Sequence, residues 1–355
     1  MLPYLFMLGY TISILLFGLN FDLYGQKWFA FFGVIVITLF AASRGFNGTD
    51  TYSYHLMFSE NISTSLIELV LMVEPLFALF LKFISLVTQN SFVFIAFVSI
   101  VQGIILVKLV FTSKKPIIFL LVYIAVFYFN FEFNIIRAGS AILLLVLASR
   151  YIDSGRNIEF YIFGVAAVLM HYSALFGFLF LVYFKENILW IKIFFTALTL
   201  LIALIVFNYF IDDSRLGIFL KYFDTVGKDQ VTQFGFGFYI TQLLYLIFYF
   251  SVVERERVIS QTFLFVAWMA MMWLGLSFEY VDRISIMVSA LFLFLSIELE
   301  LVYLKNIIRN IALVGIVVVG LFGNLTTMEN VSNSTELESR YAASPYIPYM
   351  FFWEE

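Results

Sequence analysis

The chain has 355 residues, of which 63% are hydrophobic, 20% aromatic and only 12% charged, and its mean hydropathy is +1.00. Soluble domains carry roughly 25% charged residues, so this composition excludes a soluble protein and indicates an integral membrane protein. The lack of cysteine excludes disulfides and thiolate chemistry. With a net charge of -4 and no long basic run, nucleic acid is not an expected partner. Two histidines are too few for a histidine-rich metal cage, so we expect no metal and no cofactor.

Apolar stretches long enough to cross a membrane recur along the chain. A bilayer core of roughly 30 Å needs about 20 apolar residues per helix. By this measure the predicted spans are residues 3–19, 28–42, 91–112, 117–133, 134–152, 188–210, 238–253, 260–279, 283–301 and 307–325. The first stretch lacks a basic region and a cleavage site, so we expect it to be retained and not removed as a signal peptide. The sequence predicts an all-α polytopic membrane protein.

Two further stretches do not fit a single span. Residues 65–88 contain several charges and Pro75, which breaks a helix, so we expect this segment to enter and leave the membrane on one side. Residues 157–184 are too long for one untilted span, and we expect two short helices with His171 at the tip between them. Together with the ten spans above, these two irregular or re-entrant segments bring the expected total to about 12 transmembrane helices.

The distribution of basic residues orients the predicted spans, because lysine and arginine in short loops mark the cytoplasmic face. One face collects Lys27, Lys108, Lys114, Lys115, Arg150, Arg156, Lys185, Lys192, Arg255, Arg257, Lys305 and Arg309. The opposite face is then outside, with outer loops at 43–64 and 211–237. We expect a single transmembrane catalytic domain over residues 1–325 and an outer tail over 326–355.

Three arginines at span ends, Arg44, Arg137 and Arg283, fall on this outer face although it is poor in positive charge. An arginine inside the membrane costs about 2.5–3.5 kcal/mol at a helix centre. Each arginine could instead have a separate role: Arg44 and Arg137 could bind lipid headgroups, and Arg283 could form an ion pair with Asp282. Their joint occurrence favours a shared anionic ligand, and since guanidinium grips phosphate oxygens bidentately, a pyrophosphate is the economical choice.

Candidates for a general base lie on the same face. His171 comes first because histidine titrates near neutrality, and Asp50 or Glu74 comes next. The alternatives are a buried structural histidine and a glutamate that merely precedes Pro75 at a helix break. His55 has only its position near Arg44 to recommend it.

Six segments occur in a recognisable order: SRGFNGTDTYSYHLMF, VEPLFALFLKFISL, FNIIRAGSAILLL, MHYSALFGFLF, VDRISIMVS and SPYIPYMFFW. Their order resembles the EpsG-like family of bacterial exopolysaccharide and O-antigen polymerases, also called Wzy-type polymerases. The resemblance covers residues 40–355. It implies a glycosyltransferase of the bacterial inner membrane, of GT-C-like architecture, with its active site facing the periplasm.

The resemblance also implies a substrate and a set of site residues. Such enzymes transfer a growing glycan from undecaprenyl pyrophosphate to a new undecaprenyl-pyrophosphate-linked repeat unit. The expected partners are this lipid-linked oligosaccharide as donor and acceptor, membrane lipids and a chain-length regulator protein. The implied site residues are Arg44, Asp50, Glu74, Asn134, Arg137, His171, Arg283, Tyr346 and Tyr349.

Two other functions stay open on the residues alone. A flippase or transporter of lipid-linked oligosaccharide could use an arginine-lined cavity, but it should show functional charges at the midplane and on both faces, whereas here they gather outside. An O-antigen ligase-like transferase or acyltransferase acting on the same lipid carrier would also suit a histidine beside outer arginines. Only the resemblance of the six segments separates it from a polymerase.

Overall fold

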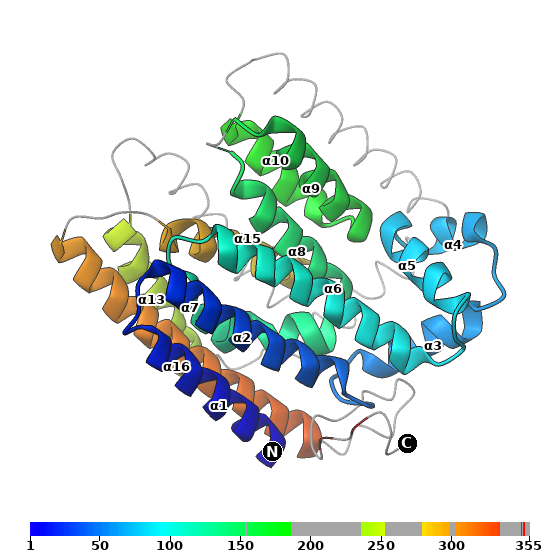
Figure 1. Ribbon diagram of the computed structural model, residues 1–355, viewed down its shortest axis with the longest axis horizontal. Helices are drawn as coiled ribbons and strands as arrows, with labels where there is room; N and C mark the ends of the chain where they lie inside the picture. Colours follow the sequence, from blue (N-terminus) through cyan, green and yellow to red (C-terminus); the bar gives the residue numbers. More distant parts are fainter. Residues whose placement is uncertain are drawn as a thin grey trace, which may run out of the picture.

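The structure is a computed structural model that describes residues 1–152, 155–185, 236–252, 279–298 and 303–333, with Tyr349 and Phe351. Every regular element in these ranges is a helix, as Figure 1 shows, which confirms the predicted all-α fold. The predicted spans 188–210 and 260–279 and the outer loop 211–237 lie almost entirely outside the described residues. The count of about 12 crossings and the GT-C-like architecture stay predictions.

The helices follow one another with short connections in the first half of the chain. They are α1 (Leu2–Gly18), α2 (Leu23–Ala42), α3 (Thr51–Asn61), α4 (Leu66–Met72), α5 (Pro75–Ser85), α6 (Ser91–Thr112) and α7 (Pro116–Val122). Two π-helices come next, η1 (Tyr123–Phe127) and η2 (Asn130–Asn134). The remaining described helices are α8 (Ile136–Ser149), α9 (Asn157–Met170), α10 (Ala174–Lys185), α13 (Phe236–Val252), α15 (Glu279–Ile297) and α16 (Tyr303–Asn333).

Among the described residues, three helices have the length and apolar composition to cross a membrane: α2, α6 and the part of α16 from Lys305 to Met328. The bounds of α6 coincide with the predicted span 91–112. α2 begins before residue 28 because the Asp22 carboxylate accepts a hydrogen bond from the Gly25 N–H and caps the helix. α16 continues to Asn333, beyond the predicted end of the last span, since no proline interrupts its final turns.

The chain between α7 and α8 is an irregular helix that ends at Ile135, where the backbone leaves the helical region. The predicted boundary between two spans at residues 133 and 134 is therefore displaced by one or two residues. The Gln102 side chain satisfies groups that this break exposes, donating hydrogen bonds to the Phe131 and Ile136 carbonyl oxygens at 3.2 and 2.9 Å. The break sets Arg137 in the first turn of α8.

Both irregular stretches are pairs of short helices, as predicted for residues 157–184. For residues 65–88 the break at Pro75 was predicted, and the entry and exit of that segment on one side of the membrane stays a prediction. α4 and α5 are separated by the extended residues Val73 and Glu74, and Pro75 occupies the first turn of α5, where its missing N–H costs nothing. α9 and α10 are separated at His171, whose backbone is extended. Each break therefore presents a titratable side chain from a non-helical residue.

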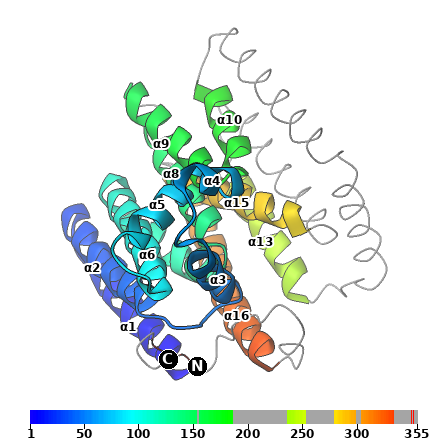
Figure 2. The same ribbon diagram turned by 90° about the vertical axis from the view of Figure 1, so that its right-hand side faces the viewer.

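α2 and α6 pack antiparallel, with Trp28 against Phe111 and Thr38 against Gly103. The chain that joins them, residues 43–90, therefore emerges at one end of the molecule and carries α3, α4 and α5 there. We call this the α3–α5 end, and Figure 2 views the molecule from it.

The opposite end is held together by Glu298, at the end of α15. Its carboxylate accepts hydrogen bonds from the Ser113 hydroxyl at 2.6 Å and the Lys114 N–H at 2.8 Å, and it pairs with Arg150 at 2.9 Å. The ends of α6, α8 and α15 thus meet at this one carboxylate. This Glu298 end contains Lys114 and Arg150, which are among the basic residues used to predict the cytoplasmic face.

Candidate functional site

Three predicted site residues meet at the α3–α5 end. One Glu74 oxygen, Oε2, accepts a hydrogen bond from Arg137 Nη1 at 2.7 Å. The other, Oε1, lies 2.5 Å from His171 Nδ1. Glu74 is 63 residues from Arg137 and 97 from His171 along the chain. We call these residues the Glu74–Arg137–His171 cluster.

All three side chains of the cluster come from helix breaks. Glu74 precedes α5, Arg137 lies in the first turn of α8, and His171 separates α9 from α10. The packing of α9 against both α5 and α8 brings the three breaks together. The features that looked irregular in the sequence are therefore the ones that build the cluster.

Exposure differs across the cluster. The Glu74 side chain is 6% exposed and that of His171 12%, whereas that of Arg137 is 22% exposed. The Arg137 guanidinium lies 5.9 Å from the ring centre of Tyr54 and 5.5 Å from that of Phe77, in cation–π contact. A guanidinium has five N–H donors, so Arg137 can hold Glu74 through one edge and present another to an anion. The carboxylate itself is covered.

The contact with Glu74 also fixes how His171 can act. When Nδ1–H donates to the carboxylate, Nε2 becomes the proton acceptor of a neutral imidazole. The neighbouring Tyr172 is 55% exposed, so the break at His171 borders the surface. Glu74 and His171 are the two members able to ligate a metal, and the described part of the chain holds no group of three or more such residues.

Arg44 lies in a different environment. Its side chain is 1% exposed, and Nη1 donates hydrogen bonds to the Ala41 carbonyl oxygen at 3.1 Å and to the Ser99 hydroxyl at 3.3 Å. The guanidinium lies 4.9 Å from the ring centre of Phe133 and near the buried Glu132. Arg44 shares no contact with the cluster, and protein encloses it.

Asp50 and Asn134 shape the loop that follows α2. Asn134 Oδ1 accepts a hydrogen bond from the Thr49 N–H at 3.0 Å, and Asp50 Oδ1 accepts one from the Thr49 hydroxyl at 3.3 Å. Gly48 has a φ of +99°, and a Cβ there would lie 2.4 Å from the Phe133 carbonyl oxygen. The loop therefore packs tightly on η2, and these contacts are separate from the cluster.

Tyr349 attaches the C-terminal tail to the end of α2. Its hydroxyl donates to the Phe40 carbonyl oxygen at 2.7 Å, and its ring stacks on the Phe40 ring with 4.4 Å between centres. The next described residue, Phe351, forms an isolated backbone bridge with Arg44. Tyr346 lies outside the described residues.

The backbone of Arg283 lies at the level of the cluster. α8 and α15 share their C-terminal end through the Arg150–Glu298 ion pair, and both contact α10 at Gly177. At about 1.5 Å per residue, Arg137 lies about 20 Å before Arg150 along α8 and Arg283 about 23 Å before Glu298 along α15. The two arginines thus occupy corresponding positions on two helices that run in the same direction.

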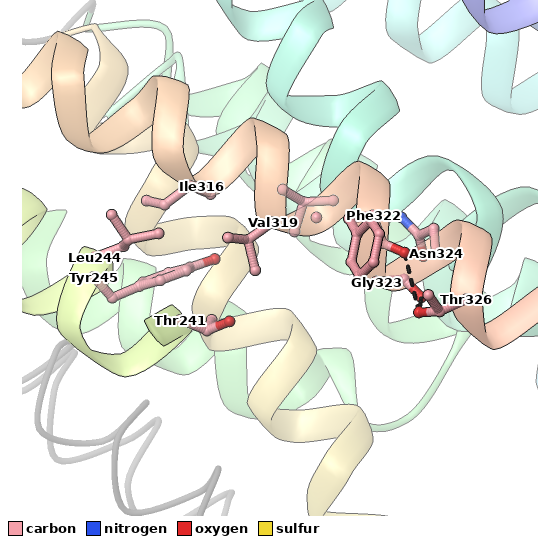
Figure 3. Close-up of a pocket in the computed structure, with 11 residues that line it drawn as sticks. Thr241, Leu244, Tyr245, Ile316, Val319, Phe322, Gly323, Asn324 and Thr326 are labelled. Carbon is pink, nitrogen blue, oxygen red and sulfur yellow. Dashed lines mark hydrogen bonds between the residues drawn. The ribbon is translucent and has the colours of Figure 1, made fainter. Parts of the chain in front are cut away.

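A separate cavity of about 480 Å³ lies between α13, α16 and η1 (Figure 3). Its walls are mostly apolar, with Leu244, Ile316 and Phe322 among them. Its polar groups already have partners: the Thr326 hydroxyl donates to the Phe322 carbonyl oxygen, and the Asn324 amide donates to Ala125. Among the described residues, no carboxylate, histidine or cation lines this cavity, and no cluster residue reaches it.

Fold and site together define a helical membrane protein with a carboxylate, a cation and a histidine assembled at one end. The chain belongs to the EpsG family, whose model matches residues 27–350. The family is one of exopolysaccharide or Wzy-like polymerases, so it indicates a polysaccharide polymerase-like glycosyltransferase in a membrane and confirms the resemblance of the six segments. No curated protein and no solved structure matches the chain.

The sequence did not point to Tyr54 and Phe77, whose rings flank the Arg137 guanidinium. Tyr54 was visible only as one of several hydroxyl-bearing residues after Asp50, and Phe77 as one of many phenylalanines in an apolar run. Neither pattern distinguishes a side chain that faces a buried cation from one that faces lipid.

Proposed function

We propose that this protein is a polysaccharide polymerase of the bacterial inner membrane, acting on undecaprenyl-pyrophosphate-linked repeat units at the periplasmic face. It transfers the growing glycan from its undecaprenyl pyrophosphate to a hydroxyl of a newly delivered lipid-linked unit. The observation that carries the proposal is the joining of Arg137 and His171 through Glu74. One cluster then offers a cation for the pyrophosphate and a base for the hydroxyl.

The transfer step follows from this arrangement. His171 Nε2 takes the proton of the acceptor hydroxyl as its oxygen attacks the anomeric carbon of the donor. The bond from that carbon to the pyrophosphate oxygen breaks, and its electron pair leaves with the undecaprenyl pyrophosphate. Arg137 stabilises the charge that grows on this leaving group. The products are the lengthened lipid-linked glycan and free undecaprenyl pyrophosphate.

Glu74 has two tasks in this proposal. It orients the imidazole by its contact with Nδ1 and balances the positive charge that His171 acquires on taking the proton. It also holds the guanidinium of Arg137 against Tyr54 and Phe77. Glu74 is therefore a positioning residue here, and His171 is the base.

The corresponding position of Arg283 on α15 supports a second cation for the same pyrophosphate. Two arginines can share the charge of a pyrophosphate between its two phosphoryl groups. Arg137 and Arg283 together supply the positive charge that stabilises the leaving group. Arg44 has a structural role, because its side chain is enclosed.

The test is a reaction with purified protein in lipid nanodiscs. The substrate is undecaprenyl-pyrophosphate repeat units without nucleotide sugar or added metal, and the products are separated by glycan length. We expect dimers and longer glycans from the wild type and a rate lower by about 10²- to 10⁴-fold from His171→Gln. The matched control is Tyr172→Phe, which changes the exposed neighbour and should keep the wild-type rate. Movement of the lipid-linked unit across the membrane without bond formation would overturn the polymerase in favour of a carrier.

A further inference from the structure

Four partly exposed rings gather where α3 and α6 begin. Tyr52 and His55 stack with an interplanar angle of 21° and 6.0 Å between centres. The Phe46 ring stands edge-on to both His55 and Phe92, at 5.1 and 5.0 Å. We call Phe46, Tyr52, His55 and Phe92 the aromatic platform. None of the four is fully buried, so the platform reaches the surface of the molecule.

Polar groups lie at the edge of these rings. His55 Nδ1 is 2.5 Å from the Ser91 hydroxyl, the residue that begins α6. This contact fixes the imidazole and leaves Nε2 at its other edge. Tyr52 adds a phenolic hydroxyl that can donate or accept a hydrogen bond. Flat apolar faces with hydrogen-bonding edges match a sugar ring, whose C–H groups stack on aromatic faces while its hydroxyls bond at the rim.

The aromatic platform is a neighbour of the Glu74–Arg137–His171 cluster. On α3 it includes Tyr52 and His55, while Tyr54, between them in sequence, turns its ring toward Arg137. At about 100° per residue, Tyr52 points about 160° away from Tyr54 and His55 about 100° away, so the platform and the ring that flanks Arg137 lie on different sides of α3. α6 makes a second connection, because Phe94 contacts Phe77, which also flanks Arg137.

We propose that the aromatic platform binds a sugar ring of the glycan close to the point of transfer. This inference rests on the proposed polymerase function and adds a glycan subsite to it. The occupant is a saccharide because the site combines stacked rings with a hydrogen-bonded imidazole and shares α3 with Tyr54, whose ring flanks Arg137 in the cluster. Its task is to hold the glycan between successive transfers, so it sets how many units are added before release.

The experiment measures glycan binding apart from catalysis. The probe is the set of repeat-unit oligosaccharides that mild acid releases from the lipid carrier of the producing cells. These released oligosaccharides carry no pyrophosphate. Saturation-transfer NMR with the full chain in nanodiscs reports contact of the sugar protons with the protein. We expect binding by the wild type, at least a tenfold weaker apparent affinity in Tyr52→Ala and Phe92→Ala, and recovery in Phe92→Trp. Leu56→Ala, on the exposed side of the same helix, is the matched control and should bind as the wild type does.

Two readouts separate this inference from the proposed function. Arg137→Ala should keep glycan binding and slow polymerisation by about 10²- to 10³-fold, while the platform variants should still form bonds but yield shorter polymers. Glycan binding without polymerisation by the wild type would contradict the proposed function and leave the subsite standing. Unchanged affinity and polymer length in folded Tyr52→Ala and Phe92→Ala would overturn the subsite and assign these rings to a membrane-interface belt.

Discussion

Arg44 and Arg137 carry the same side chain at the end of an apolar stretch, yet the fold uses them in opposite ways. Arg44 is enclosed near the buried Glu132, with its guanidinium against one phenylalanine. Arg137 is paired with Glu74 and remains 22% exposed. The difference arises from the backbone, since Arg137 follows a helix break that opens at the surface, whereas Arg44 is covered by α6 and by Phe351.

This comparison shows that an arginine and a carboxylate brought near each other in apolar surroundings do not define a site by themselves. Buried charges must be paired to be tolerated, whether or not they act on a ligand. What distinguishes the cluster is a third titratable group, His171, on the same carboxylate. Expressed as free energies, the effects of substitutions at Arg44, Arg137, Glu74 and Tyr349 should decrease in that order.

The largest effect is expected at the enclosed arginine, and it should be one of stability. Arg44→Met removes a buried guanidinium and its hydrogen bonds to the Ala41 carbonyl oxygen and the Ser99 hydroxyl. Since a hydrogen bond to a charged group is worth about 1.5–3 kcal/mol, the expected loss is about 3–6 kcal/mol of the free energy of unfolding. The measurement is thermal unfolding of the purified variant in detergent. If Arg44→Met were as stable as the wild type, Arg44 would have no structural role, and its contrast with Arg137 would fail.

Arg137→Ala should have the next largest effect, and it should be one of rate. Loss of a group that stabilises developing negative charge lowers a rate by about 10²- to 10³-fold, or about 2.7–4 kcal/mol. The measurement is polymer formation from lipid-linked repeat units at equal protein level. Arg137→Lys keeps the charge but not the planar fork, so an intermediate rate is expected. Normal polymer from Arg137→Ala would remove this residue from the site.

Glu74→Gln should reduce the rate by about 10- to 100-fold, as expected for a group that orients another. The amide keeps the shape of the side chain and loses its charge, so it positions His171 and Arg137 less well. The measurement is the same polymerisation assay. Glu68→Gln is the matched control, because Glu68 is an exposed carboxylate that caps α4 in the same segment. Equal rates for the two variants would show that the position of Glu74 in the cluster has no consequence for transfer.

The smallest effect is expected for Tyr349→Phe. Removing the hydroxyl deletes the hydrogen bond to the Phe40 carbonyl oxygen, worth about 0.5–1.5 kcal/mol of the free energy of unfolding, together with a long contact of 3.4 Å to the Ser43 hydroxyl. Thermal unfolding should detect this change, and the polymerisation rate should stay as in the wild type. A lowered rate with unchanged stability would instead make Tyr349 a substrate ligand.

Much of the architecture was predictable because its causes are local. The membrane class follows from composition, the span of α6 from an unbroken apolar run, and the break before α5 from Pro75. The paired short helices around His171 followed from length alone. These features depend on the hydrophobic thickness of a bilayer and on the geometry of proline, which the sequence states directly.

The composition of the cluster was predictable only in part. Glu74, Arg137 and His171 could each be selected as unusual residues in apolar surroundings, but their meeting depends on how α5, α8 and α9 pack. The same criteria selected Arg44, which the fold encloses. Exposure is set by long-range packing, and a periodic apolar pattern carries no information about which of two polar residues remains open to a ligand.

The ion pair between Arg150 and Glu298 has a mechanical consequence for the far end of the molecule. It fastens the C-terminal ends of α8 and α15 together, and the same carboxylate also holds the turn after α6. Because α8 and α15 are held together at their C-terminal ends, any separation of these two helices is expected at their N-terminal ends, which begin at Ile136 and Glu279.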